Sequence, residues 1–165
     1  MPTGKYNAMK KIMLTFGLFV LLGSIFISCD QNRYYEKNEA IDQNIWYYRD
    51  AKTFEVDIVD SLQAFNFYIN VRNTIDYEYA NLYFFIKTEL PNGKLAVDTI
   101  ECQLANLEGK WLGSGSSEFR DNSFILMQNM RFTQKGMYRF YLKHGMRSDS
   151  LQGIADVGIR LEISK

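Results

Sequence analysis

The sequence predicts an all-β fold, an antiparallel β-sandwich of the jelly-roll or immunoglobulin-like kind. Several segments alternate apolar and polar residues with a period of two, which is the pattern of strands that bury one face. Turn-forming residues separate these segments at spacings of roughly ten residues, as in sandwiches. The chain has 12 Phe and 11 Tyr but 2 Pro, a composition that favours strands over helices.

An apolar N-terminal segment precedes this domain. A basic head over 9–11 is followed by residues 12–27, which contain no charged residue, Asn or Gln. A membrane-spanning helix needs about 20 apolar residues, so this shorter segment is typical of a signal peptide. Its end resembles a bacterial lipobox that finishes at Cys29, although Phe26 stands where Leu is usual. We predict a lipoprotein signal peptide over 1–28 and a lipid on Cys29; a plain secretory signal and an uncleaved anchor are the alternatives.

The net charge of the mature chain restricts the classes of partner that it can bind. Three of the 19 basic residues precede Cys29, which leaves 16 basic against 19 acidic residues after it. A mildly acidic chain without clustered Lys and Arg argues against a nucleic acid as partner. With Cys29 acylated, Cys102 is the one thiol left, so no disulfide within the chain stabilises the domain.

Residues 29–45 are polar and lack a steady periodicity. We interpret them as a lipid-proximal tether that leads to a β-sandwich domain over 46–165. Two alternatives are an edge strand that begins at Tyr34 and Tyr35, and a helical turn over 34–41.

The first half of the domain contains four predicted strands. Segments 54–58 and 65–71 carry apolar residues at every second position. A longer strand over 82–90 leads into Pro91-Asn92-Gly93, in which Pro presets its φ and Asn-Gly tolerates the positive φ of tight hairpins. The chain then returns over 94–104, where alternate residues oppose the preceding strand: Leu95, Val97 and Thr99.

The second half resumes the same pattern after a long loop. We predict strands over 124–132 and 137–143, separated by a turn at Lys135-Gly136, and a last strand over 154–163. The residues expected to face inward in these last two strands are Tyr138, Phe140, Leu142, Val157, Ile159, Leu161 and Ile163.

The loop over 106–122 is the most distinctive feature outside the strands. It is rich in Gly and Ser around a single Trp, and long loops on a rigid sheet are common binding elements. We hypothesise that four of its residues contribute to a partner surface: Trp111, Glu118, Arg120 and Asp121. The alternative is that the loop folds back, with Trp111 as a plug and Arg120 paired internally.

The sequence offers little catalytic equipment. His144 is the single histidine, which excludes an ordinary zinc site. We expect it to lie in a turn before Gly145, with its imidazole solvated or hydrogen-bonded to the backbone. Cys102 lies in a predicted strand without a cationic neighbour, so a small buried residue is favoured over a nucleophile. The acidic residues that flank the loop do not have EF-hand spacing. We therefore predict a protein that is not an enzyme, with no metal and no cofactor.

Aromatic residues allow a second kind of binding. Trp46, Tyr47, Tyr48 and Trp111 are candidates for a platform on which sugars stack, whereas we assign other rings to the core. These core rings are Phe65, Phe67, Phe84 and Phe140.

Several segments, in order, resemble the gliding-motility lipoprotein GldH family of Bacteroidetes. They are the signal ending at Cys29, Val71-Arg72-Asn73-Thr74 with Asp76-Tyr77 and Tyr79-Ala80-Asn81-Leu82, Asp98-Thr99-Ile100-Glu101, Gly109-Lys110-Trp111-Leu112-Gly113-Ser114-Gly115, Arg120-Asp121-Asn122, and Met146-Arg147 with 151–160. Gln152 stands where the family often has Pro, and Ser116-Ser117 replaces a more glycine-rich continuation.

This resemblance implies a lipoprotein held to a membrane of the cell envelope, outer membrane or periplasm-facing, through the lipid on Cys29. It implies an accessory or scaffold of the gliding machinery linked to type IX secretion, with other envelope proteins as partners. A glycan-binding surface lipoprotein of a nutrient-uptake system is the alternative, and it predicts coplanar exposed rings on one face. A hydrolase would need paired carboxylates that converge in a cleft.

Overall fold

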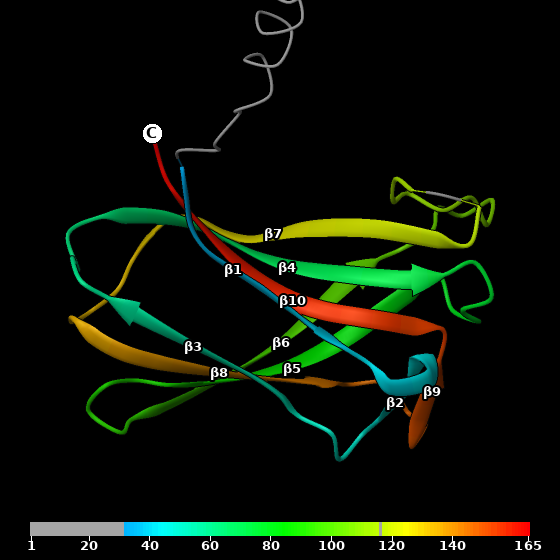
Figure 1. Cartoon of the computed structure of the whole chain (residues 1–165), viewed down its shortest axis with the longest axis horizontal. Helices are drawn as coiled ribbons and strands as arrows, with labels where there is room; N and C mark the ends of the chain where they lie inside the picture. Colours follow the sequence, from blue (N-terminus) through cyan, green and yellow to red (C-terminus); the bar gives the residue numbers. More distant parts are fainter. Residues whose placement is uncertain (1–31, 116) are drawn as a thin grey trace, which may run out of the picture. The chain divides into compact units, whose positions relative to one another are not determined.

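The computed structural model describes residues 32–115 and 117–165, which form strands and one short 3-10 turn with antiparallel pairing throughout (Figure 1). The elements in chain order are β1 (Arg33–Ala40), η1 (Asp42–Asn44), β2 (Ile45–Tyr47), β3 (Lys52–Ile58), β4 (Ala64–Thr74), β5 (Asn81–Glu89), β6 (Leu95–Gln103), β7 (Phe119–Arg131), β8 (Gly136–His144), β9 (Ser150–Gln152) and β10 (Ile154–Ile163). The predicted all-β class is confirmed. The signal peptide predicted over 1–28 and Cys29 lie outside the described residues.

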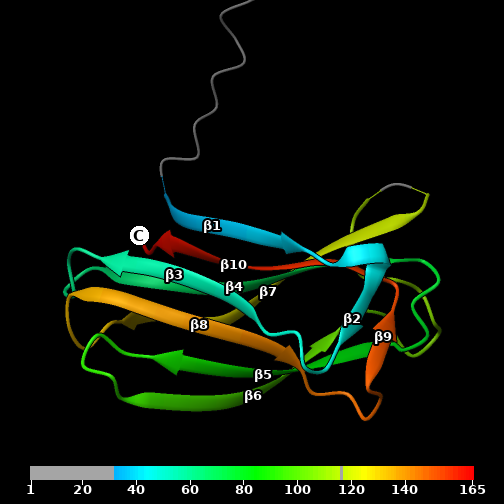
Figure 2. The ribbon, with the colours of Figure 1, turned by 60° about the horizontal axis from the view of Figure 1, so that its bottom comes forward.

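Two four-stranded sheets form the sandwich (Figure 2). The first has the order β1-β10-β4-β7, the second has the order β3-β8-β5-β6, and β2 and β9 form a small additional pair. Chain neighbours such as β3 and β4, β6 and β7, or β7 and β8 therefore lie in different sheets. This order is that of a jelly roll, so of the two predicted kinds of sandwich the structure takes the jelly roll.

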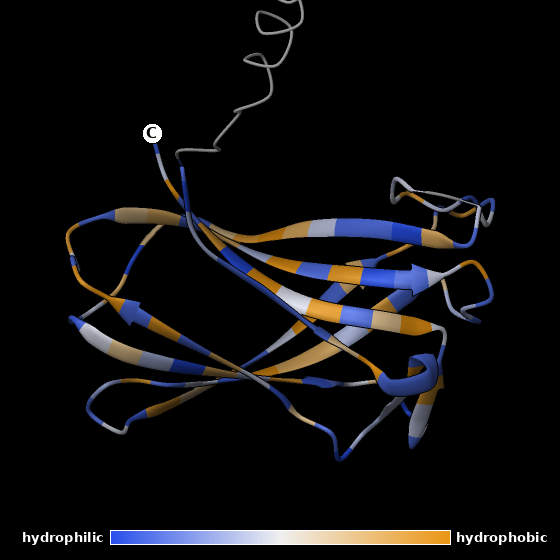
Figure 3. Ribbon diagram, viewed as in Figure 1, coloured by the Kyte–Doolittle hydropathy of each residue, from blue (hydrophilic) through white to orange (hydrophobic). Residues whose placement is uncertain are grey.

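The core lies between the two sheets and follows the period-two pattern, which Figure 3 shows as alternating orange and blue along the strands. In β4, every second residue from Phe65 to Val71 is buried, and in β8 the same holds from Tyr138 to Leu142. The four rings assigned to the core are all buried, as predicted. Each fully buried side chain of this size contributes roughly 1.5–3 kcal/mol, which makes this core the main source of stability.

The structure differs from the prediction at the start of the domain. Residues 33–40 form β1, an edge strand paired with β10, instead of part of a tether over 29–45. Tyr34 packs against Phe65 with 4.9 Å between ring centroids, and its hydroxyl donates to the Asp57 carbonyl at 2.7 Å. The alternative of an edge strand at Tyr34 and Tyr35 matches the structure. The outer face of this edge strand is solvated, which is why its composition resembles that of a linker.

The predicted hairpin between β5 and β6 is present. The Gly93 amide donates to the Leu90 carbonyl at 2.8 Å, and Gly93 has a φ of 78°, in the left-handed region that glycine adopts at no steric cost. Leu95 and Val97 pair with Glu89 and Lys87 of β5, as predicted. Both apolar side chains are nevertheless exposed to solvent.

The loop between β6 and β7 ends earlier than predicted, because β7 begins at Phe119. Backbone hydrogen bonds fix the loop: the Leu112 amide donates to the Leu104 carbonyl at 2.8 Å, and the Asn106 amide to the Lys110 carbonyl at 2.9 Å. Residues 104–112 of the loop are therefore held to one another by backbone hydrogen bonds.

Candidate functional site

The outer face of the first sheet carries a cluster of polar side chains around Asn70. Strand alternation turns the apolar residues of β4 and β10 inward, and the intervening polar residues outward. Because β1, β10, β4 and β7 lie side by side in that order, outward residues from four strands become neighbours.

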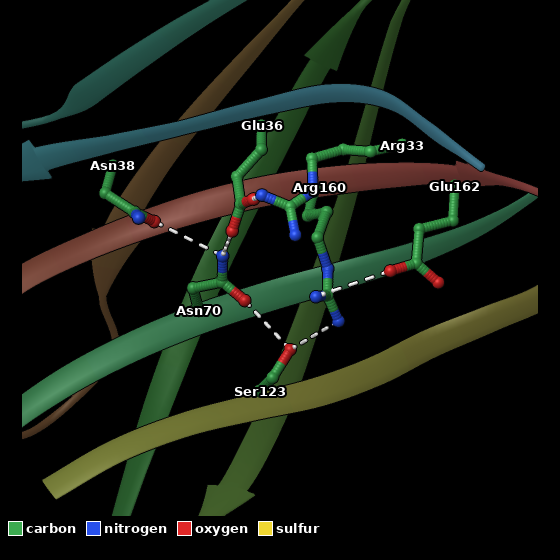
Figure 4. Close-up of polar contacts among 7 residues, drawn as sticks. All are labelled: Arg33, Glu36, Asn38, Asn70, Ser123, Arg160 and Glu162. Atoms are coloured by element: carbon green, nitrogen blue, oxygen red, sulfur yellow. Dashed lines mark hydrogen bonds and ion pairs between the residues drawn. The ribbon is translucent and has the colours of Figure 1, made fainter. Parts of the chain in front are cut away.

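Asn70 is the centre of a hydrogen-bond network on this face (Figure 4). Its Nδ2 donates to Glu36 Oε1 at 2.9 Å and to Asn38 Oδ1 at 3.3 Å. Its Oδ1 accepts from Ser123 Oγ at 2.9 Å, and Ser123 Oγ accepts in turn from Arg160 Nη2 at 3.1 Å. The network thus crosses all four strands and fixes the orientation of each side chain.

Two ion pairs and one contact with an aromatic ring further restrain the charged side chains of this network. Arg33 Nη1 lies 2.6 Å from Glu36 Oε2, and Arg160 Nη1 lies 3.3 Å from Glu162 Oε1 (Figure 4). The Arg160 guanidinium also lies over the Tyr68 ring, 4.3 Å from its centroid. Contacts of this kind hold a long side chain in one rotamer.

Gly158 makes the close approach of β1 possible. A Cβ atom at this position would overlap the side chain of Asn38 and the carbonyl oxygen of Lys37. Glycine is therefore required here for steric reasons, since it lets Asn38 lie flat across β10 and reach Asn70.

A hollow of about 300 Å³ is lined by the network and extends to where β4 ends and β7 begins. Its lining includes Arg72, Asp121, Asp156 and Ser114. Arg72 Nε lies 3.5 Å from Asp121 Oδ1. Burial raises the pKa of the Asp156 carboxyl, an effect that Arg72 opposes and Asp121 reinforces. The hollow offers charges of both signs, which suits a polar partner better than a purely anionic or apolar one.

The structure separates the four predicted contact residues. Asp121 lines the hollow, and Glu118 is exposed directly before β7. Arg120 occupies the adjacent position of β7, so its side chain belongs to the opposite face of the sheet, where its Nη1 donates to the Phe119 carbonyl at 2.8 Å. Trp111 is half-buried and packs against the core. The four residues therefore do not form one surface.

Sequence reasoning missed most residues of this face. The strand pattern places Asn70, Arg72 and Arg160 on outward faces, and that signal is visible in the sequence. It does not reveal that β10 lies between β1 and β4, which is what brings Glu36, Asn70 and Arg160 together.

The two residues with catalytic potential are both buried. His144 is the last residue of β8 rather than part of a solvated turn, because the inward phase of Tyr138, Phe140 and Leu142 continues to it. Cys102 is buried, as predicted, and burial raises the pKa of its thiol to about 12. Neither side chain is accessible to a substrate in this conformation.

The predicted sugar platform loses one of its two Trp rings. Trp46 is fully buried, and its Nε1 donates to the Asp50 carbonyl at 2.8 Å, whereas Tyr47 and Tyr48 are exposed. The aromatic ring pairs in contact within the described residues are inclined by 51° to 73°. None of these pairs within the described residues joins two of the four candidate rings, so the described ring contacts do not assemble them into a platform.

Within residues 32–115 and 117–165, no three His, Cys, Asp or Glu side chains gather as metal ligands would. No helix in this part of the chain has the length and apolar character required to cross a membrane.

A family model described as GldH lipoprotein matches residues 33–161, from the first residue of β1 to within the last strand. The chain belongs to the GldH lipoprotein family. A gliding motility lipoprotein GldH homolog of Christiangramia forsetii is 33% identical over 158 residues, which are 90% of this chain and 96% of that protein. The gliding motility lipoprotein GldH of Flavobacterium johnsoniae is 29% identical over 153 residues, or 88% of this chain and 94% of that protein.

Solved structures are more distant from this GldH family member. A family GH115 4-O-methyl-α-glucuronidase covers 84% of this chain but 18% of its own length, with 11% identity and a TM-score of 0.42. A TM-score at this level supports neither a shared fold nor a shared activity.

Four of the segments on which the GldH resemblance rests contribute to the lining of the hollow, and they are 71–74, 109–115, 120–122 and 151–160. Val71-Arg72-Asn73-Thr74 at the end of β4 pairs with 119–122 of β7, so that Arg72 lies opposite Asp121. Asn122 Nδ2 donates to Asn73 Oδ1 at 3.0 Å, and both amides are buried. The Thr74 amide donates to the Gly153 carbonyl at 2.8 Å. Residues far apart in the sequence thus build one corner of the domain.

Proposed function

We propose that this protein is a membrane-anchored lipoprotein of the cell envelope that acts without catalysis. It serves as an accessory or scaffold component of the gliding motility machinery linked to type IX secretion, attached through a lipid on Cys29. The observation that carries the proposal is that four of the GldH-like segments, 71–74, 109–115, 120–122 and 151–160, converge around the hollow at Arg72 and Asp121.

The outer face of the first sheet is the surface that contacts a partner in this proposal. Its side chains are held by mutual hydrogen bonds, so few rotamers are lost when another protein binds. Charged groups of both signs give such a face specificity for a complementary protein surface. Of the four contact residues predicted from the sequence, Glu118 and Asp121 contribute to this partner surface.

Burial of the reactive side chains supports a role without catalysis. A thiol whose pKa is about 12 supplies almost no thiolate at neutral pH, and the buried imidazole of His144 has no access to a substrate. The outer face of the first sheet is therefore proposed to bind a partner and not to catalyse a reaction.

The test compares two paired substitutions that each remove one positive and one negative charge. Arg72→Ala/Asp121→Ala alters the hollow, and Lys37→Ala/Glu39→Ala removes an exposed ion pair elsewhere on β1. Each variant is expressed in a gliding bacterium in place of that organism's own GldH family protein. Proteins are then crosslinked in intact cells, and those captured with the variant are identified. We expect the first variant to lose its crosslinked envelope proteins and colony spreading, with unchanged abundance, and the second to retain both. If the two variants showed the same crosslinked proteins and the same colony spreading, the outer face of the first sheet would not be the partner surface.

A further inference from the structure

At one end of the sandwich, Asn32 precedes the first strand and Ser164 follows the last. The Ile163 amide donates to the Asn32 carbonyl at 2.7 Å, and the Ser164 amide donates to the Ala64 carbonyl at 2.9 Å. The loops over 59–63, 90–94 and 132–135 lie at this same end, because β3, β5 and β7 all finish there (Figure 2). We call it the entry end.

The entry end displays apolar side chains on an ordered backbone. Leu62 is 80% exposed, Val59 63% and Leu95 61%. The Leu62 carbonyl accepts from Arg131 Nε at 3.1 Å, and the Val59 amide donates to the Tyr34 hydroxyl at 3.3 Å. These bonds hold the loop in a conformation that turns its apolar side chains to the outside.

Apolar exposure alone does not distinguish the two ends, because Leu107 and Leu112 are exposed at the opposite end. Charge does distinguish them. The entry-end loops carry Lys94 and Lys135 against Asp60, and the segments before β1 and after β10 add Asp30 and Lys165. The loops at the opposite end carry Asp42, Asp50, Asp76, Glu78, Glu108, Glu118 and Asp149 against Arg49, Lys110 and Arg147. An anionic lipid surface attracts basic residues by about 1 kcal/mol each and repels acidic ones.

The length of chain between the anchor and the fold decides what covers the entry end. Two residues, Asp30 and Gln31, separate Cys29 from Asn32. An extended chain spans at most about 3.6 Å per residue, so Cys29 lies within about 11 Å of Asn32. A tether over 29–45 would leave the domain free to tumble, but one this short keeps the entry end at the surface that holds the lipid.

We propose that the entry end packs against the lipid bilayer, with Leu62, Val59 and Leu95 in the interface and the lysines at the headgroups. This inference rests on the acylation of Cys29 in the proposed function. A strand of 11 residues such as β4 spans on the order of 35 Å, at about 3.3 Å per residue. The loop between β6 and β7 and the corner at Arg72 are then held away from the membrane, where an envelope partner reaches them.

The experiment uses the mature acylated protein, Cys29 to Lys165, reconstituted into vesicles of phosphatidylethanolamine and phosphatidylglycerol. Leu62→Cys and, as a control, Leu107→Cys each receive the same environment-sensitive fluorophore. Cys102 is buried and stays unlabelled in the folded protein. Nitroxide-labelled lipid then reports how close each probe lies to the bilayer. We expect blue-shifted emission and at least threefold stronger quenching for Leu62→Cys than for Leu107→Cys.

Two failures have distinct signatures. Equal quenching of both probes in protein whose intact mass includes acyl chains would overturn the orientation and leave the proposed function standing. An intact mass without acyl chains would overturn the anchoring on which both proposals depend, whatever the probes report.

Discussion

His144 lies among aromatic rings, 5.4 Å from the Trp46 centroid and 5.8 Å from that of Tyr48. Neither ring nitrogen makes a hydrogen bond of ordinary geometry within the described residues. Burial lowers the pKa of the imidazole, and the backbone of Trp46 opposes part of this shift. The folded state therefore favours the neutral ring.

This environment predicts a pH-dependent stability. In the unfolded chain the imidazole binds a proton near its ordinary pKa of about 6.5, whereas the folded protein resists protonation, so stability falls as the pH drops below 6.5. One proton contributes at most about 1.4 kcal/mol per pH unit. We expect His144→Phe to show a flatter decrease in Tm between pH 7 and pH 5 than the wild type. His144 is the only histidine, so identical slopes would contradict the prediction.

Trp111 supplies a second residue-level prediction. Its ring packs partly against the core, and its backbone pairs with that of Ala105. We expect Trp111→Ala to lower the free energy of unfolding by about 2–3 kcal/mol, less than the loss at a fully buried ring. Its neighbour Leu112 is 59% exposed, and Leu112→Ala should change stability by less than about 0.5 kcal/mol. Urea unfolding measures both, and an unaltered Trp111→Ala midpoint would indicate a displayed ring.

At the level of elements, local chemistry explains the β5–β6 hairpin completely. Pro91 and Asn92 precede Gly93 at its left-handed position, and Lys94 closes the turn with a carbonyl that accepts from the Leu90 amide at 2.9 Å. All of these residues are adjacent in the sequence, so the turn was predictable. β1 was harder to assign, since its strand character depends on pairing with β10, more than 100 residues later.

The hairpin gives a graded prediction. A Cβ atom at Gly93 meets no atom within 4 Å, so the cost of substitution is conformational and not steric. Gly93→Ala should destabilise the domain by about 1 kcal/mol, and Gly93→Asn by less, because Asn tolerates the left-handed region better. Thermal unfolding ranks the two variants. A larger loss for Asn than for Ala would show that the turn does not depend on positive φ.

At the scale of the whole molecule, the described fold begins at Asn32 and the predicted lipid site is at Cys29. Attachment and folding are therefore separable. Cys29→Ser should remove nearly all incorporation of a clickable fatty acid and shift the protein from the membrane fraction to the supernatant. The Tm of the domain should stay unchanged, because the strands and the buried core that stabilise it lie within residues 33–163. Equal labelling of Cys29→Ser and wild type would contradict acylation at this residue.

The sequence by itself determined the β class, the inward residues of most strands, the hairpin and the resemblance to the GldH family. These depend on neighbours along the chain: period-two burial, turn chemistry and short motifs. Tertiary structure decided the jelly-roll order, the burial of His144 and the assembly of Glu36, Asn70, Ser123 and Arg160 into one face. The physical reason is that strand alternation fixes which side of a sheet a residue occupies, whereas only the pairing of distant strands fixes which residues lie beside it.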